Sequence, residues 1–323
     1  MVSGRIPLRR IVLAVVILVA ILVRPASGQA PVYPGATWAR VPSADQAGWS
    51  EEKLKEARAY AGTIATAAVM IVAGGHVVDE WGDTATRFNI HSIRKSFLSA
   101  LYGIHVRDGR IQLSKTLADL DIDDRNPLTP VEKSATVGDL LKARSGVYHP
   151  ALYETPGMAT ARPARGSYAP GVFWYYNNWD FNALGTILDQ ATKTSIYQDF
   201  KTRIAEPLEM EDFRLEDGEY FRGPESVHAA YPFRMTARDM ARFGLLYARG
   251  GQWRGRSVVS REWVEESTKG RVYSARGAGG HHIVVVPHLD LVVVHRVNTD
   301  IRGREVTNSQ FGHLMQRILD ARK

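Results

Sequence analysis

The stretch His91-Ser-Ile-Arg-Lys-Ser96 decides how this chain is interpreted, because it places a serine three residues before a lysine at the start of a helix. Side chains at positions i and i+3 share a helix face, so Ser92 and Lys95 can meet. A serine hydroxyl is a weak nucleophile until a base takes its proton, and a lysine with a lowered pKa can be that base. The helix predicted from Ser92 onward buries one apolar stripe, formed by Ile93, Phe97, Leu101 and Ile104.

The same four-residue pattern occurs a second time, as Ser50-Glu-Glu-Lys53. There the serine precedes two acidic residues and a polar helix, which is typical of a helix N-cap followed by an acidic first turn. An isolated Ser-x-x-Lys is therefore weak support for a nucleophile. Ser92 needs support from motifs elsewhere in the chain.

Residues 1–28 have the pattern of a secretory signal peptide. Arginines at positions 5, 9 and 10 precede an apolar run from Ile11 to Val23, and small residues follow at 26–28. Thirteen apolar residues are short for a membrane span of about 20, so cleavage is favoured over an uncleaved N-terminal anchor. We therefore expect a protein exported to the periplasm or the exterior, with membrane contact only through this segment if it is retained.

The remaining residues, 29–323, are long enough for one large domain with a sizeable core. The formal net charge of +7 includes four arginines of the leader, so the mature chain carries about +3. Outside the leader there is no long basic run, and this argues against a nucleic-acid partner. The chain has no cysteine, which excludes disulfides.

Strand patterns lie at both ends of the domain, with helices and loops between them. Two hairpins are predicted, 67–81 around Gly74-Gly75, and 283–297 around a Pro-His-Leu-Asp turn. A terminal helix follows over about 308–321. We expect an α+β fold whose antiparallel sheet lobe comes from about 50–90 and 270–323, covered by the terminal helix. The segment of about 92–268 would form a helical lobe, with Ser92 in the cleft at the junction.

A second motif combines aromatic residues with side-chain amides, in Phe173-Trp-Tyr-Tyr-Asn-Asn-Trp-Asp-Phe-Asn-Ala-Leu-Gly185. A tyrosine near a cationic lysine can have a lowered pKa and carry a proton to a leaving group. An asparagine two residues later can hydrogen-bond both the lysine and a substrate. The structural alternative is an aromatic loop packed on the core, with asparagines capping turns.

Taken in order, Ser92-x-x-Lys95, a Tyr-x-Asn and the glycine-rich Gly277-Ala-Gly-Gly280 resemble the serine β-lactamase and DD-peptidase superfamily. The resemblance is greatest to the class C and esterase branch, and within it to 6-aminohexanoate-dimer (nylon oligomer) hydrolases. It covers roughly residues 45–320 and implies the β-lactamase/transpeptidase-like fold. It also implies a serine hydrolase that cleaves small amide or ester substrates through an acyl-enzyme, without metal or organic cofactor.

The resemblance also implies the site residues. In the family the motif tyrosine lies nine residues before a helix glycine, and Gly185 then selects Tyr176 and Asn178 over Tyr175 and Asn177. Ser92 would be the nucleophile, Lys95 the base, Tyr176 the proton relay and Asn178 the group that positions Lys95 and the substrate. The oxyanion would be held by the N–H of Ser92 and the glycines Gly279 and Gly280, with Gly280 the main candidate.

Two departures from the family pattern stand out. The third motif usually begins with Lys or His, and here Gly277 takes that place, which argues against ordinary penicillin or cephalosporin hydrolysis. A Tyr-Gly-Tyr-x-Trp-Trp-like strand expected before that motif is also missing, which would expose a sheet edge. The alternatives are therefore a cell-wall DD-peptidase or weak β-lactamase, or a degenerate binding protein that does not hydrolyse its ligand.

Three other groups of residues have simpler readings. The histidines at 281, 282, 288 and 295 lie in or beside strands and lack a metal-binding spacing, so we predict no metal site. Arg162 and Arg165 are either a solvated basic loop or a carboxylate-binding pair. The aromatic residues Trp174, Trp179 and Tyr273 can each line a pocket or belong to the core.

Overall fold

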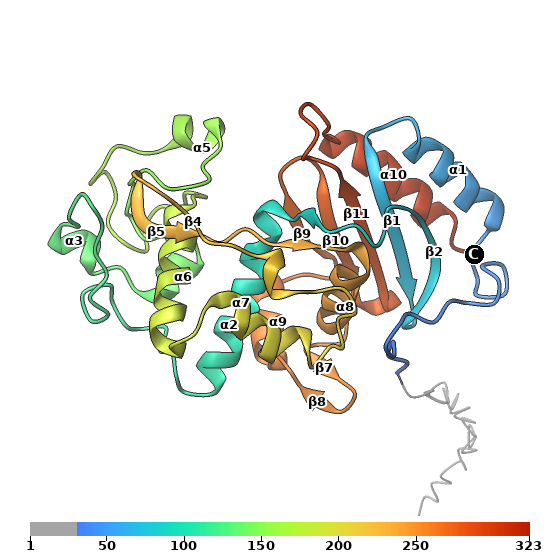
Figure 1. Ribbon diagram of the computed structural model, residues 1–323, viewed down its shortest axis with the longest axis horizontal. Helices are drawn as coiled ribbons and strands as arrows, with labels where there is room; N and C mark the ends of the chain where they lie inside the picture. Colours follow the sequence, from blue (N-terminus) through green and yellow to red (C-terminus); the bar gives the residue numbers. More distant parts are fainter. Residues whose placement is uncertain (1–30) are drawn as a thin grey trace, which may run out of the picture. The chain divides into compact units, whose positions relative to one another are not determined.

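The computed structural model describes residues 31–323, so the predicted leader at 1–28 lies outside the described residues (Figure 1). Both ends of the domain contribute to one five-stranded antiparallel sheet, which confirms the predicted fold class. The strand order is β2-β1-β11-β10-β9. The strands are β1 (Thr66–Ala73), β2 (His76–Gly82), β9 (Tyr273–Gly277), β10 (His281–Val286) and β11 (Leu291–Val297).

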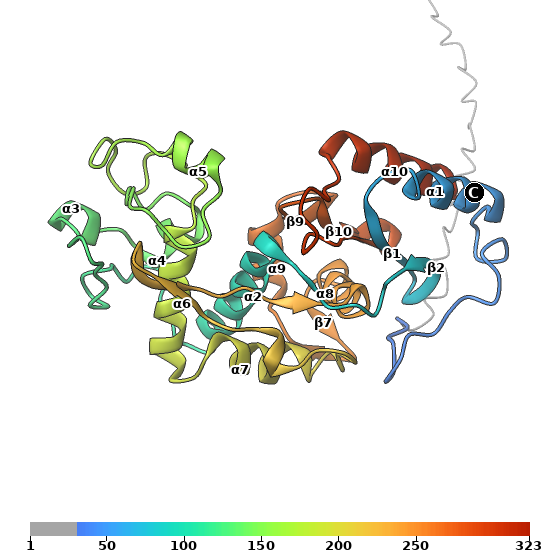
Figure 2. The same ribbon diagram turned by 45° about the horizontal axis from the view of Figure 1, so that its top comes forward.

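The central strands are buried on both faces because helices cover the sheet on each side. Helices α1 (Glu51–Ala61) and α10 (Asn308–Asp320) pack together over one face, and α8 (Ala237–Ala248) lies against β10 and β11 on the other (Figure 2). Successive strand residues point to opposite faces, so Val293 joins the core under α10 while Val294 joins the core toward α8.

Helix α2 (Arg94–Arg107) continues the single 3₁₀ turn η1 (His91–Ile93), and all four residues of its predicted apolar stripe are buried. The other helices of this lobe are α3 (Pro130–Lys133), α4 (Val137–Leu141), α5 (Pro156–Ala161), α6 (Trp179–Thr192), α7 (Ile196–Phe200) and α9 (Arg261–Thr268). Short two-stranded ribbons connect them, formed by β3 (Phe88–Asn89) with β6 (Arg234–Met235), β4 (Phe221–Gly223) with β5 (Ser226–Ala230), and β7 (Gln252–Trp253) with β8 (Arg256–Ser257).

Further single turns complete the described chain. Helix α7 is followed directly by one π-helical turn, η2 (Lys201–Ala205). Two 3₁₀ turns lie later in the chain, η3 (Leu215–Asp217) and η4 (Pro287–Leu289). Within residues 31–323, no helix is both long and apolar enough to cross a membrane.

The glycine-rich stretch Gly277-Ala-Gly-Gly280 is the turn that joins β9 to β10. Gly277 ends β9, the next three residues turn the chain, and β10 begins at His281. Gly279 and Gly280 have φ angles of 81° and 99°, in the region where a Cβ is strained, so glycine suits this turn. Residues 269–272 run directly from α9 into β9 and form no further strand. Strand β9 is therefore an edge strand of the sheet.

Candidate active site

Ser92 lies in the turn η1, and the residue before it is held in a strained conformation. His91 has a φ of 48°, which is uncommon for a side chain with a Cβ. Its N–H donates to Asn89 Oδ1 at 2.9 Å, and its Nε2 lies 2.8 Å from Thr299 Oγ1. These contacts fix the turn, so Ser92 is presented at the head of α2.

The structure brings Ser92, Lys95 and Asn178 into one hydrogen-bonded chain. Lys95 Nζ lies 3.2 Å from Ser92 Oγ and 2.8 Å from Asn178 Oδ1. Asn178 donates through Nδ2 to the backbone carbonyls of Leu152 and Tyr153. The Asn178 side-chain oxygen is thereby oriented toward the Lys95 amine. Hydrogen bonds within the protein hold the three side chains together.

Burial gives Lys95 an unusual electrostatic environment. Desolvation lowers the pKa of the Lys95 amine well below its usual value of 10.5, and the neighbouring Arg94 lowers it further. The ion pairs among the described residues include none to Lys95, so no carboxylate there stabilises its charged form. A neutral amine within hydrogen-bond distance of Ser92 Oγ can accept the hydroxyl proton.

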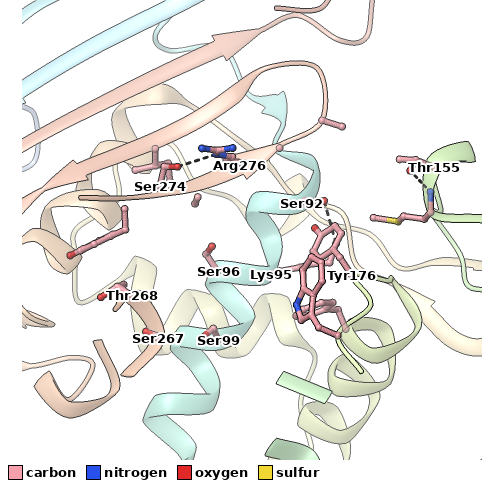
Figure 3. A pocket seen from close by; sticks show the side chains of 18 of the residues that line it. Ser92, Lys95, Ser96, Ser99, Thr155, Tyr176, Ser267, Thr268, Ser274 and Arg276 are labelled. Carbon is pink, nitrogen blue, oxygen red and sulfur yellow. Dashed lines mark hydrogen bonds between the residues drawn. The ribbon is translucent and has the colours of Figure 1, made fainter. Parts of the chain in front are cut away.

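Tyr176 also reaches this cluster, but its phenol does not have the lowered pKa that the sequence predicted. The Lys95 amine lies over the face of the Tyr176 ring, 4.8 Å from its centroid, and not beside its oxygen. Burial raises the pKa of Tyr176, and its hydrogen bond to Ser92 and the charge of Arg94 only partly offset this. Tyr176 is therefore a protonated donor at neutral pH, positioned beside Ser92 (Figure 3).

Asp180 anchors the segment that carries Tyr176 and Asn178. The fully buried carboxyl accepts from Ser145 Oγ at 2.6 Å, and its own N–H donates to Asn177 Oδ1 at 2.8 Å. Burial raises the pKa of Asp180 to about 7. This cluster fixes the aromatic segment at the start of α6, which is how the second motif is held against the first.

Arg94 completes the inner wall behind Lys95. Its guanidinium is buried, donates to Asn182 Oδ1 at 3.1 Å and stacks on the Tyr231 ring at 4.1 Å from the centroid. The sequence analysis did not select Arg94, Ser145 or Asp180. Their chemistry resides in burial and in contacts between distant segments, and these leave no local pattern in the sequence.

Gly277 is the position where the third motif touches the nucleophile turn. A Cβ added at Gly277 would lie 2.4 Å from the backbone oxygen of Ile90, so only glycine lets β9 approach η1 this closely. That requirement matches the obligatory glycine at the third place of the Lys/His-x-Gly pattern. The register is therefore Ala275-Arg276-Gly277, and Ala275, rather than Gly277, occupies the place of the missing cation.

The register also changes the candidate oxyanion donors. The Gly280 N–H donates to Gly277 O at 3.3 Å, within the turn. A Cβ at Gly279 would meet Thr299 Cγ2 at 2.4 Å, which places that residue against the neighbouring loop. Gly277 and Ala278 line the cavity together with Ser92, whereas the predicted Gly279 and Gly280 are not part of its wall.

We expect Gly277→Ala to lower the free energy of unfolding by about 1–3 kcal/mol, because β9 or η1 must move to accept the methyl group. Hydrolytic activity falls with it, since the same shift displaces Ser92. Urea unfolding measures the first effect. Gly312→Ala is the matched control: a Cβ there meets nothing within 4 Å in α10, so the helix gains up to about 1 kcal/mol. Equal stability of the two variants would contradict the close approach.

A cavity of about 1360 Å³ opens around Ser92 (Figure 3). It is bounded by α2, by β9 with β10, and by the aromatic segment before α6. Among the described residues its wall contains two cations, Lys95 and Arg276, and no carboxylate. Trp174 and Tyr273 belong to the wall, whereas Trp179 is core and donates to Asp124 Oδ2 at 2.7 Å.

The remaining sequence candidates have structural partners. Arg165 pairs with Glu132 at 2.7 Å and Arg162 pairs with Glu154, so both arginines are engaged. Burial lowers the pKa of His282 to about 3 and that of His295 to about 4, which keeps both neutral in the sheet. In residues 31–323, no cluster of His, Asp and Glu has the arrangement of a metal site.

Comparison with known proteins was made for the whole chain. A sequence model of the family described as Beta-lactamase matches residues 51–310. No curated protein matches the chain at a significant level. The family match covers both the Ser92 turn and the glycine turn after β9.

Solved structures share the fold at low sequence identity. A Bacillus anthracis protein assigned as a 6-aminohexanoate-dimer hydrolase has a TM-score of 0.63 and 18% identity, covering 90% of this chain and 88% of its own. FmtA from Staphylococcus aureus has a TM-score of 0.61 and 15% identity, with coverages of 90% and 93%. A class C beta-lactamase has a TM-score of 0.58 and 14% identity, with coverages of 84% and 94%. The resemblance inferred from the motifs is confirmed, and this chain belongs to the beta-lactamase family.

Proposed function

We propose that this protein is a serine hydrolase that cleaves ester or amide bonds of small substrates through an acyl-enzyme. The observation that carries the proposal is the buried Lys95 amine, which lies 3.2 Å from Ser92 Oγ and is held by Asn178. Burial lowers the pKa of the Lys95 amine well below its usual value, so the amine loses its proton more readily and can serve as the base beside the nucleophile. Burial of an amine is energetically unfavourable, and binding alone does not require it. Its position beside Ser92 is better explained by a role in catalysis.

In the acylation step, Lys95 takes the Ser92 proton while Oγ attacks the substrate carbonyl carbon. The oxyanion is stabilised by the N–H of Ser92 and, in the register fixed by Gly277, by the N–H of Ala278. Tyr176, whose hydroxyl hydrogen-bonds Ser92, gives its proton to the leaving group; Lys95 then releases its extra proton to solvent, and the Tyr176 phenolate regains one from solvent. A water then attacks the acyl-enzyme, with Lys95 accepting its proton and Ser92 recovering its own.

The second candidate is a cell-wall DD-peptidase or weak β-lactamase. It is favoured by the position of Arg276 in the cavity wall. Its guanidinium is exposed on β9 in the cavity wall, where it offers a cation for a substrate carboxylate. The residue in the place of the family's Lys or His is Ala275, which brings no charge to the centre of the site. An uncharged ester or amide therefore fits the wall better.

Intact-mass spectrometry tests the proposed function. The chain from residue 29 is incubated with a fluorophosphonate, a p-nitrophenyl ester, a D-Ala-D-Ala peptide and a chromogenic cephalosporin. One covalent adduct per molecule, mapped to the peptide containing Ser92, supports an activated serine. Turnover of the peptide or the cephalosporin ahead of the ester would favour the second candidate. A folded protein that gains no adduct from any reagent would leave the binding-protein alternative in place.

Tyr176→Phe tests the proton donor. We expect kcat for an alkyl ester, whose leaving group needs a proton, to fall about 10²-fold. The loss for the p-nitrophenyl ester of the same acid is much smaller, because p-nitrophenolate leaves without protonation. Steady-state kinetics on the two esters measure this difference. An equal loss on both would mean that Tyr176 acts by packing on Lys95, and not as a donor.

A further inference from the structure

The cavity has two arms that meet at Ser92 (Figure 3). One arm runs toward α5 and the aromatic segment, past Tyr176 and Trp174. The other, which we call the sheet arm, runs along α2 between this helix and strand β9, and α8 and α9 close its sides. Ser96, Ser99 and Ala275 line the sheet arm, and Tyr273 and Ser267 stand at its far end.

Three hydroxyl groups at the far end of the sheet arm donate to backbone carbonyls of the protein itself. Ser267 Oγ donates to Trp263 O at 2.7 Å, and Thr268 Oγ1 donates to Val264 O at 2.6 Å. Tyr273 donates to Tyr247 O at 2.9 Å. These residues therefore present carbon surfaces to the cavity. The far end of the arm is therefore apolar despite its hydroxyl groups, and Phe243, Ile283 and Val285 add hydrocarbon side chains to the wall.

The shape of the sheet arm follows from small side chains on facing elements. Ser96 and Ser99 lie on the same stripe of α2 as Ser92, and Ala275 faces them from β9, on the same side of the strand as Tyr273 and Gly277. Ser92 and Ser99 are seven positions apart, which is about 10 Å along the helix. Ser267 is exposed, so the arm opens to solvent at that end.

Tyr176 decides which part of a substrate enters this arm. Tyr176 hydrogen-bonds Ser92 and belongs to the aromatic segment, whereas Ser96 and Ser99 lie farther along α2 (Figure 3), so we expect the leaving group to depart toward the aromatic arm. The acyl group then extends into the sheet arm. An extended chain advances about 1.2 Å per bond, so about 10 Å accommodates a linear acyl chain of roughly eight carbons.

Resting on the proposed function, we propose that the substrate class is esters or amides of linear, uncharged, medium-chain carboxylic acids, with the acyl chain bound in the sheet arm. The described cavity wall contains no carboxylate, so a positively charged chain end is unfavourable there. A 6-aminohexanoyl chain places an ammonium in this apolar arm. A hexanoyl chain does not, and is the better substrate.

A series of p-nitrophenyl esters from acetyl to dodecanoyl tests the proposal. Each methylene that enters the arm raises kcat/KM by about fourfold at most, and octanoyl exceeds acetyl by roughly 100-fold or more. Beyond about eight carbons the added methylenes emerge past Ser267, and the rate reaches a plateau. The hexanoyl ester exceeds the 6-aminohexanoyl ester by about tenfold or more. A flat series, or a preference for the amino ester, would overturn the proposal.

Ala275→Phe places a ring in the sheet arm and lowers the octanoyl-to-acetyl ratio by about tenfold or more. Val272→Phe is the matched control, because it adds a ring of the same kind one residue before β9. Val272 is 55% exposed and lies outside the cavity wall, so this variant keeps the wild-type ratio. An unchanged ratio in Ala275→Phe would place the acyl chain elsewhere.

A calorimetric measurement of how tightly octanoate and acetate bind to Ser92→Ala separates this proposal from the proposed function. Suppose that octanoate binds at least tenfold more tightly than acetate and that Ala275→Phe removes this difference. That result supports acyl binding in the sheet arm even if Ser92 proves inert. Hydrolysis that depends on Ser92 but not on chain length, together with equal binding of octanoate and acetate, refutes acyl binding in the sheet arm. The proposed hydrolase function is then still supported.

Discussion

Ser92→Ala is expected to reduce kcat/KM for a p-nitrophenyl ester by about 10⁴-fold or more, to the level that binding and oxyanion contacts alone provide. The expected loss is this large because, in the proposed mechanism, Lys95 and Tyr176 act only through the serine oxygen. Ser92 is half-buried at the head of α2, and its hydroxyl supports no core packing. The fold therefore remains, and circular dichroism with urea unfolding should show a protein as stable as the wild type.

The chain offers its own control in the second Ser-x-x-Lys. Ser50 caps α1 by accepting from the N–H of Lys53 at 3.3 Å, far along the chain from the cavity. Ser50→Ala should lower the free energy of unfolding by about 1 kcal/mol and leave hydrolysis unchanged. The two substitutions thus have opposite signatures. Substantial activity in Ser92→Ala would assign the chemistry to another residue and remove the basis of the proposed mechanism.

The sequence could predict elements whose cause is local. The apolar stripe from Ile93 to Ile104 predicts α2 because helical spacing needs no partner to be recognised. The two hairpins that form four of the five sheet strands follow from alternation and turn residues in the same way. Thr136 forms a capping box at the start of α4 with Asp139, three residues later, as its acidic partner. Each of these features is determined within a few residues of the chain.

Properties that depend on distant contacts could not be predicted. The register of the third motif is determined by Ile90, whose carbonyl leaves no room for a Cβ at Gly277. The direction of the Tyr176 pKa depends on whether Lys95 lies at the hydroxyl or over the ring, a matter of packing alone. The choice of Tyr176 over Tyr175 needed the family spacing. In the structure Tyr175 OH donates instead to Met158 O, away from Lys95.

Lys95→Met should lower kcat/KM by about 10³–10⁴-fold while leaving Ser92 in place, because the variant lacks the base that removes its proton. Lys95→Arg is the matched variant: it places a permanent cation at the site, because a guanidinium stays protonated and cannot act as the base. We therefore expect both variants to be inactive. Recovery of activity in Lys95→Arg would show that the positive charge, and not the basicity of Lys95, drives the reaction.

The pH dependence follows from the direction of the Lys95 pKa. In the proposed mechanism the active form of Lys95 is the neutral amine. We therefore expect wild-type activity to fall as the pH drops through the lowered pKa of Lys95, which lies well below 10.5, and to be level above that pKa. The unfolded chain binds the Lys95 proton more tightly than the folded protein, so stability rises with pH between the two pKa values. Lys95→Met removes this contribution. Rate profiles and urea unfolding from pH 5 to 10 measure both effects, and an ascending limb centred at an ordinary lysine pKa would contradict a neutral Lys95 base.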